Sequence, residues 1–354
     1  MDAVVLRPKS LSLAGYPKSD TLFGALCWGI RFISGNETLE KMLEDFRNGD
    51  PPFVISSAFP CALSVATVVE YLIPMPFFTI PSKFFELSAS KRMEIVGNYK
   101  KLKKVRWADA SLVFDILKGR VTIYDILESI EKVKDSGKGD WCFQDYNYKD
   151  GVLSRHDVPI YKEVDMVGNA INRITSSTGE NFFFYKGYAM SRRGAMYFII
   201  KHRKNCENIV RPALRFLEDR GIGGKISSGK GAFEIIQIRT NIDEKLAEMS
   251  SGKTVLNLST YIPTHEEIVQ FKNAGTKPIY NLLVRGGVIE SGLASESNPW
   301  KARTMCFGEG SLFPAIENRE VYGQNPVVHD KKYKVQQYGF SFYLRGDLKL
   351  EDFT

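Results

Sequence analysis

An eleven-residue glycine-rich loop constrains the fold of this chain more than any other segment. Residues 221–231 read GIGGKISSGKG, with five glycines, two lysines and two serines. Glycines allow positive φ angles and a close approach of the backbone to a ligand, whereas serines, exposed amides and lysines supply donors and charge. Such a loop is typical of a phosphate-binding site. The predicted contacts are Gly223, Gly224, Lys225, Ser227, Ser228, Gly229, Lys230 and Gly231.

The flanking segments decide which kind of phosphate site this is. Residues 208–220 have apolar side chains at helical spacing, and Gly221 fits the position that ends a helix. Residues 232–238 (AFEIIQI) read as a strand. A Walker A loop follows a strand, opens a helix and needs a hydroxyl where this chain has Gly231, so the pattern argues against a nucleotide hydrolase. A plain flexible connection stays open as an alternative.

Composition sets wider limits on the fold and the partners. A chain of 354 residues with 44% hydrophobic content predicts two globular units. The excess of 48 Lys and Arg over 41 Asp and Glu, a net charge of +7, favours a polyanionic partner only mildly. The five cysteines form no C-x-x-C pair, so we expect neither a metal site nor disulfides, and no cofactor.

We expect a cytoplasmic protein with no contact to a membrane. The first residues lack the charged-then-apolar order of a signal peptide. The most apolar stretch, residues 53–78, is interrupted by prolines and Glu70 before it reaches a membrane-spanning length. It predicts one inner strand followed by a proline-braced loop.

The order of elements predicts an α+β fold. A strand at residues 3–6, a helix at 21–32 with Ser19 or Asp20 as N-cap, and a strand at 53–57 come first. Residues 181–190 and 195–201 read as the two strands of a hairpin, followed by the helix, the glycine-rich loop and the last strand. The simplest account is a βαββαβ unit, the ferredoxin-like or RRM-like fold.

Two domains follow from this order. Residues 1–245 form the first RRM-like domain, with a large insertion at about 60–179 and the glycine-rich loop at 221–231. Residues 250–354 form a second, degenerate RRM-like domain. Its predicted elements are strands at 254–262, 279–290, 303–307 and 338–344, and a helix opened by a capping box of Thr264 and Glu267.

The chain resembles a known family over nearly its whole length. The matching segments are SDTLFGALCW (19–28), PPFVISSAFP (51–60), YLIPMP (71–76), GNAINRITSSTGENFFF (168–184), GIGGKISSGKGAF (221–233) and YGFSFYL (338–344). These resemble subunit four of the Csm complex, a RAMP-superfamily protein of type III-A CRISPR interference. The resemblance implies a subunit that caps the 5′ end of the guide RNA (crRNA) and holds its repeat-derived handle. It also implies contacts with the large polymerase-like subunit, a backbone RAMP subunit and target RNA near the handle.

The same resemblance implies a thumb hairpin that is pushed into the guide and target duplex. We place it at about residues 140–179, because residues 169–178 are similar to the RAMP thumb region, which makes Arg173 a candidate RNA contact.

Other segments leave alternatives open. The insertion interleaves aromatic and basic residues, and its aromatic side chains either stack on RNA bases or form an ordinary core. The aromatic residues are Trp141, Phe143, Tyr146, Tyr148 and Tyr161, and the basic residues are Lys149, Arg155, His156 and Lys162. Lys18 and Ser19 at the start of the first helix are either an anion site or a plain cap. Lys301 and Arg303 meet either phosphate or an acidic partner.

We predict no catalytic residue. RAMP relatives that cut repeat RNA typically carry a histidine near the first helix, and this chain has none before His156. Asp20 corresponds in place to a target-cleaving aspartate of related backbone subunits, but its position at the helix start favours capping. The sequence therefore predicts a non-catalytic RNA-binding subunit. The alternative is a metal-independent CRISPR repeat endoribonuclease.

Overall fold

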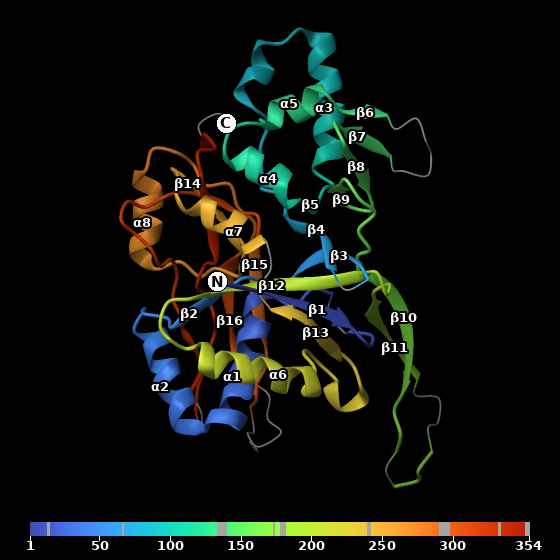
Figure 1. The fold of residues 1–354 in the computed structure, drawn as a ribbon, viewed down its shortest axis with the longest axis vertical. Helices are drawn as coiled ribbons and strands as arrows, with labels where there is room; N and C mark the ends of the chain where they lie inside the picture. The colour runs from blue at the N-terminus through green and yellow to red at the C-terminus, as the bar shows by residue number, and fades with distance from the viewer. Residues whose placement is uncertain are drawn as a thin grey trace.

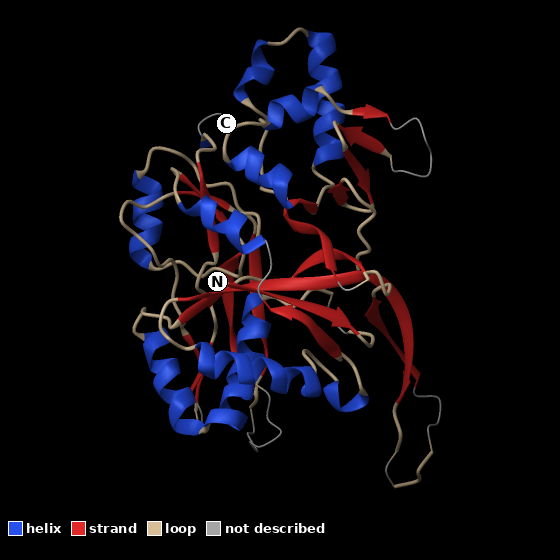
Figure 2. Ribbon diagram, in the orientation of Figure 1, coloured by secondary structure: helices blue, strands red, loops and turns tan. Residues whose placement is uncertain are grey.

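The chain is an α+β molecule built on one long sheet (Figures 1 and 2). The computed structural model describes residues 1–12, 15–65, 67–132, 140–172, 174–177, 182–238, 242–289, 298–331 and 334–350. Within them the sheet runs in the order β13-β1-β12-β3-β4-β5-β9-β8-β7-β6, and β2 also pairs with β12. None of the described helices is long and apolar enough to cross a membrane.

The centre of this sheet is antiparallel. β1 (Asp2–Pro8) lies between β12 (Gly194–His202) and β13 (Phe233–Ile238), with Val4 opposite both Phe198 and Ile238. β12 pairs on its other side with β2 (Phe53–Ile55) and β3 (Phe59–Ser64). The strand predicted at 3–6 and the strand predicted at 232–238 are therefore confirmed.

Two helices pack together against the central strands. They are α1 (Ser19–Ser34) and α6 (Glu207–Arg220), and α2 (Asn36–Arg47) follows α1 directly (Figure 1). A Cβ atom on Gly29 of α1 would lie 2.9 Å from the carbonyl oxygen of Ala213 in α6. The helix backbones are thus in direct contact, which fixes the end of α6 relative to α1.

The predicted hairpin is wrong. β11 (Phe182–Ala189) pairs with β10 (Lys162–Asn169), not with β12, and this two-stranded ribbon projects away from the body (Figure 1). The physical reason is burial. The first seven residues of β12 are all buried, so the strand needs a sheet neighbour along both edges, and β1, β2 and β3 provide them.

The apolar stretch at 53–78 forms three strands, not the single strand predicted. β2 and β3 are followed by β4 (Thr67–Pro74), which carries the sheet away from its centre. Pro60 does not prevent this arrangement, because the β3–β4 pairing begins at Cys61.

Beyond β4 the insertion forms a lobe of its own, at the top of Figure 1. Its elements are η1 (Ser82–Glu86), α3 (Ala89–Leu102), β5 (Trp107–Asp109), α4 (Ala110–Leu117), α5 (Ile123–Glu128), β6 (Glu131–Lys132), β7 (Trp141–Phe143), β8 (Tyr146–Lys149) and β9 (Val152–Ser154). Trp141 and Tyr148 are buried and stacked, with ring centroids 4.9 Å apart. Phe143 and Tyr146 are buried as well. These aromatics are core residues, so base stacking by them is excluded, and residues 140–154 belong to the lobe, not to a thumb.

A buried carboxyl pair joins the lobe to the sheet. Glu70 of β4 accepts hydrogen bonds from the backbone N–H groups of Arg155 and His156, both at 2.9 Å. Asp109 accepts from the N–H of Ser111 at 2.7 Å and caps α4. Burial raises the pKa of Glu70, and a hydrogen bond to Asp109 and its negative charge raise it further. We infer that Glu70 is protonated at neutral pH and donates to Asp109.

The C-terminal part contains a three-stranded sheet and two ribbons. β14 (Thr254–Asn257) lies between β17 (Leu312–Pro314) and β20 (Tyr343–Gly346). The ribbons are β15 (Leu282–Val288) with β16 (Trp300–Phe307), and β18 (Val327–Asp330) with β19 (Lys334–Gln336). The helices are α7 (Ile242–Ala247), followed by η3 (Glu248–Ser250), and α8 (His265–Asn273), which has the predicted capping box of Thr264 and Glu267.

The strand predicted at 338–344 begins only at Tyr343, because the residues before it pack against the first half of the chain. The backbone N–H of Ile55 donates to the Tyr338 hydroxyl at 2.8 Å, and the Phe340 ring lies 5.9 Å from Phe46.

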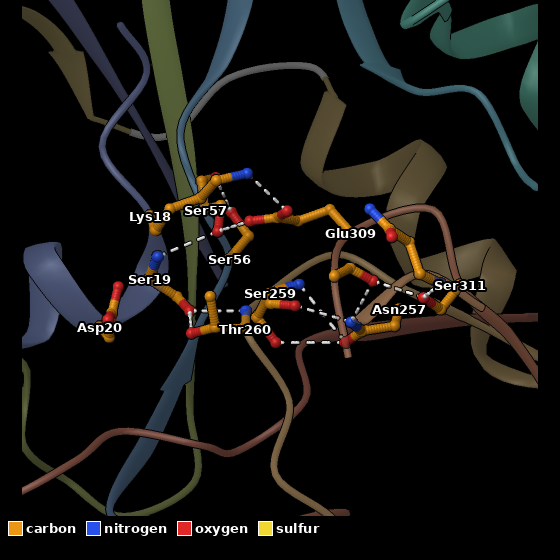
Figure 3. Close-up of polar contacts among 12 residues, drawn as sticks. Lys18, Ser19, Asp20, Ser56, Ser57, Asn257, Ser259, Thr260, Glu309 and Ser311 are labelled. Carbon is orange, nitrogen blue, oxygen red and sulfur yellow. Dashed lines mark hydrogen bonds and ion pairs between the residues drawn. The ribbon is translucent and has the colours of Figure 1, made fainter. Parts of the chain in front are cut away.

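Polar contacts continue this junction between the two halves (Figure 3). The hydroxyls of Ser19 and Thr260 are 2.7 Å apart, and Glu309 accepts from the Ser57 hydroxyl. One hydrophobic core contains residues from both halves. The two predicted domains are therefore packed into one body.

Candidate nucleic-acid interface

The glycine-rich loop is closed at its base by backbone contacts. α6 ends at Arg220, and the next residue, Gly221, has a φ of 89° and donates its N–H to the Leu217 carbonyl. The N–H of Ile222 donates to the Gly231 carbonyl at 3.0 Å, and the N–H of Gly231 donates to Leu11. A Cβ atom on Gly231 would lie 2.0 Å from the Ile222 oxygen, and its φ is 70°. Position 231 therefore requires glycine, which explains why the hydroxyl of a Walker A loop is missing.

The tip of the loop is open. Gly223, Gly224, Lys225, Ser227, Ser228 and Gly229 are exposed around the single turn of η2 (Ile226–Ser228). Nothing lies within 4 Å of a Cβ built at Gly223 or Gly229, which have φ values of 103° and 74°. The backbone N–H groups of Gly223 and Gly224 have no hydrogen-bond partner among the described residues. A ligand can thus approach the backbone closely.

Lys225 connects the loop with the β10–β11 ribbon. It adopts a left-handed conformation, with φ of 56°. Its Nζ lies 3.9 Å from the ring centroid of Tyr185 and 5.4 Å from that of Phe183, both on β11. These are cation–π distances, so the loop tip and the ribbon form one surface.

A large cleft opens beside the loop. Its volume is about 1180 Å³, and it is lined by Gly223 and Gly224, by residues of α1 and α2, by Lys301 of β16 and by Gln337, which follows β19. This volume is slightly above the range of about 300–1,000 Å³ that is usual for small-molecule pockets. Its described charged lining residues are Arg31, Lys41, Arg47, Arg220, Lys301 and Lys334, with Asp20, Glu37, Glu40 and Glu44.

Asp20 lies in the wall of the cleft but is fully engaged. Arg285 donates to its two oxygens, from Nε at 2.7 Å and from Nη2 at 2.9 Å, and the Gln337 amide donates at 2.7 Å. The N-cap residue of α1 is Lys18, so Asp20 and Ser19 are not the caps that the sequence predicted. A bidentate ion pair to a residue 265 positions away outweighs the local capping preference.

Lys301 differs from the other basic residues of the cleft because its ammonium group is partly removed from water. Burial lowers its pKa, because desolvation disfavours the ammonium form, and Arg285 lowers it further, against the opposing charge of Asp20. A phosphate in the cleft would offset this desolvation.

An aromatic group in the cleft wall was missed by the sequence reasoning. The guanidinium carbons of Arg31 and Arg220 lie 5.1 and 5.3 Å from the Trp28 ring centroid, and Phe32 stacks on Trp28 at 5.7 Å. Trp28, Arg31 and Arg220 line the cleft. The available signal was the i, i+3 spacing of Trp28 and Arg31 on one helix face.

The structure does not bring all the predicted contacts together. Ser19 is fully buried, with its N–H bonded to the Ser57 hydroxyl at 2.9 Å, so it is corrected from an RNA contact to a core residue. Lys18 forms an ion pair with Glu309, Nζ to Oε2 at 2.6 Å (Figure 3). It is therefore engaged within the chain.

The remaining predicted contacts lie apart from the loop or outside the description. His156 is exposed in the insertion lobe. Arg303 is exposed on β16, and the bulge between Lys301 and Thr304, opposite Arg285 and Gly287, puts its side chain on the other side of the ribbon from Lys301. Arg173 lies outside the described residues.

Comparison with known proteins relates this chain to one family. Residues 250–345 match the model of the CRISPR Csm4 C-terminal domain. The chain is 27% identical over 352 residues to the CRISPR system Cms protein Csm4 of Thermococcus onnurineus (strain NA1), covering 98% of this chain and 96% of that protein. One similar solved structure is the Csm3-Csm4 subcomplex of the type III-A CRISPR-Cas interference complex, with a TM-score of 0.63 and 16% identity over 98% of this chain and 100% of the other. The Csm1-Csm4 cassette in complex with cA4 matches with a TM-score of 0.56 and 19% identity over 98% of both chains.

The matched proteins are subunits of Csm complexes, which belong to the CRISPR interference machinery. The solved structures establish the shared fold, and the family model and the curated relative add the particular subunit. Over nearly its whole length the chain is similar to Csm4 of type III-A systems, and residues 250–345 match the C-terminal domain of that family.

Proposed function

We propose that this chain is a non-catalytic RNA-binding subunit that caps the 5′ end of the crRNA and holds its repeat-derived handle. One observation carries the proposal: the exposed tip of the glycine-rich loop opens directly onto the cleft, and the backbone N–H groups of Gly223 and Gly224 there have no partner within the described part of the chain. Single-stranded RNA is bound by amides and lysines at its phosphates and by aromatic rings at its bases. The loop, Lys301 and Trp28 offer these three kinds of group.

The strand order supports a RAMP-type fold. The order β13-β1-β12-β2, antiparallel and with α1 and α6 packed together, is that of a ferredoxin-like or RRM-like unit. We infer that the sheet of β14, β17 and β20 with α8 is a reduced second copy. The β10–β11 ribbon is then the thumb that meets the duplex of guide and target RNA next to the handle. Its exposed Phe182 and Phe184 are not needed for the core and suit a wedge between bases.

The partners follow from the same family. The related structures are named as complexes of Csm4 with Csm3 and of Csm4 with Csm1. We infer that this chain likewise contacts a backbone subunit and the large polymerase-like subunit, in a cytoplasmic effector complex.

Two features of the cleft support the non-catalytic assignment. The described residues that line it include no histidine. Arg285 and Gln337 donate hydrogen bonds to both carboxylate oxygens of Asp20, so neither oxygen is free to accept a proton from RNA. Cleavage of labelled repeat RNA by the purified chain in EDTA would replace this proposal with the endoribonuclease alternative.

The decisive experiment is handle-RNA binding as a function of salt. Lys225→Ala combined with Lys230→Ala should weaken binding and lower the slope of log K against log salt by roughly one to two units, about one per lost phosphate contact. Lys103→Ala with Lys104→Ala, two exposed lysines of the insertion lobe, is the matched control and should leave the slope unchanged. An unaltered slope in the loop variant would remove the loop from the RNA interface.

A further inference from the structure

Two arginines from different helices meet on one aromatic ring in the wall of the cleft. Arg31 lies in the last turn of α1, and Arg220 lies in the last turn of α6. Their guanidinium carbons are 5.1 and 5.3 Å from the centroid of the Trp28 ring, which are cation–π distances. The Trp28 ring therefore brings together two positive charges that lie far apart in the sequence.

The Trp28 ring is itself fixed by the packing of the two helices. Phe32 stacks on Trp28, and the Phe32 ring lies 5.3 Å from Phe216 of α6. Next to Trp28 in the chain, Gly29 brings the backbone of α1 against Ala213 of α6. An arginine that rests on such a ring has fewer conformations to lose on binding a ligand than one that projects into water.

The guanidinium group of Arg31 keeps donors for a ligand. Its Nε donates to the Asn36 side chain at 2.9 Å. Among the described residues its Nη atoms have no hydrogen-bond or ion-pair partner, although Glu37 and Glu40 of α2 line the same cleft. A guanidinium that lies over a ring can still present its N–H groups to phosphate in a bidentate contact.

The two arginines lie beside the tip of the glycine-rich loop. Arg220 directly precedes the loop, and it lines the cleft together with Gly223 and Gly224. The backbone N–H groups of these two glycines have no partner within the described ranges. Guanidinium groups and backbone amides both bind phosphate, so this part of the cleft wall offers several phosphate donors in succession.

We propose that Trp28 is a positioning residue for RNA, because its ring holds Arg31 and Arg220 where both guanidinium groups contact phosphates of the single strand bound at the loop tip. This inference rests on the proposed function. It gives the Trp28 ring a task besides contact with a base, namely the placement of two charges. A Trp28 with only a structural role would stabilise the contact of α1 with α6 and would leave the number of phosphate contacts unchanged.

The salt dependence of RNA binding by the full-length chain counts these contacts. With a single-stranded handle RNA, Arg31→Ala and Arg220→Ala should each reduce the slope of log K against log salt by about 0.7, the value for one phosphate contact on a single strand. At about 0.1 M salt this change corresponds to a loss of affinity of about fivefold relative to binding at about 1 M. Arg215→Ala is the matched control, because Arg215 is exposed on the same helix as Arg220 and pairs with Glu218, and it should keep the wild-type slope.

The role of the ring is tested by its own variants. Trp28→Leu should reduce the slope by up to about 1.4, because both arginines lose their support, and Trp28→Phe should restore most of it. In a chain that already carries Arg31→Ala and Arg220→Ala, Trp28→Leu should change the slope no further. Thermal unfolding reports separately on the contact of α1 with α6, and the two arginine variants do not depend on the stability of Trp28→Leu.

Three results would overturn the proposal. The first is a wild-type slope in both arginine variants. The second is a Trp28→Leu variant that loses affinity at the wild-type slope, since the ring would then act only on a base. The third is an equal effect of Trp28→Leu on the slope with and without the arginines.

An unrelated single strand of the same length separates this inference from the proposed function. Phosphate contacts carry no sequence information, so the slopes of the variants should change in the same way with this strand. If the wild-type chain binds both strands equally tightly, the handle assignment fails, and the slopes still decide the role of Trp28.

Discussion

The carboxyl pair of Glu70 and Asp109 should make the stability of this protein fall as the pH rises. Glu70 is 4% exposed and sits where β4 meets the insertion lobe, held by the N–H groups of Arg155 and His156. Two neighbouring buried carboxyls cannot both ionise at low cost, so one keeps its proton. Replacing Glu70 by Gln keeps one of the two oxygens that accept the Arg155 and His156 N–H groups and supplies a permanent donor towards Asp109.

The sign and size of the effect follow from the raised pKa of Glu70. An unfolded glutamate releases its proton near its ordinary pKa of about 4.3, whereas the folded protein keeps this proton to higher pH. Between the pKa of the unfolded glutamate and the raised pKa of folded Glu70, the native state binds more protons than the unfolded state. The free energy of unfolding therefore decreases by up to about 1.4 kcal/mol per pH unit. From pH 5.5 to 7.5 the pair removes at most about 2.7 kcal/mol by the same relation.

Urea unfolding at pH 5.5 and 7.5 measures this directly. The wild-type protein should lose stability over this interval, and Glu70→Gln should flatten the loss. Glu94→Gln, in an exposed i, i+3 pair with Lys91, is the control and should keep the wild-type pH dependence. If Glu70→Gln and the wild-type chain show the same slope, Glu70 does not hold the proton and the reasoning is refuted.

Two further predictions concern the loop and the ribbon. Gly231→Ala should lower the free energy of unfolding by more than about 2 kcal/mol, because the new Cβ would meet a backbone oxygen. Gly229→Ala is strained in φ but lies in open space, so it should lower this free energy by only about 1 kcal/mol. Thermal unfolding compares the two variants, and equal losses would contradict the loop geometry. Replacing residues 167–184 of the ribbon by an Asn-Gly turn keeps the Met166–Tyr185 pair and should leave a folded chain that still binds the handle. With target RNA bound, 2-aminopurine beside the handle should be less fluorescent in this variant than in the wild type if the ribbon is the wedge, and equal signals would place the wedge elsewhere.

Local patterns were sufficient for the helix, loop and strand around residues 207–238. The apolar spacing, the terminal glycine and the β-branched run lie next to one another, and the structure follows them closely. The pairing of β12 could not be predicted in this way, because a continuous apolar run does not reveal which segment lies beside it.

The candidate site likewise has one part that the sequence predicted and one part that it did not. The loop could be predicted because its glycines carry their own backbone requirements. The surroundings of Ser19 and Asp20 could not, since their partners Thr260 and Arg285 lie more than 240 positions away. The cleft depends on such distant contacts for its walls, so its position follows only from the folded chain.

The junction between the two halves has a consequence for synthesis on the ribosome. Ile55 is bonded to Tyr338, and Ser57 to Glu309, so the first strands obtain their final partners only when almost the whole chain has been made. Until then the growing chain exposes the apolar surface that Phe340 later covers against Phe46. Contacts of such long sequence separation also slow folding, because the intervening chain must close before they form. The nascent chain therefore passes through an aggregation-prone interval that lasts until the segment around Tyr338 and Phe340 has emerged.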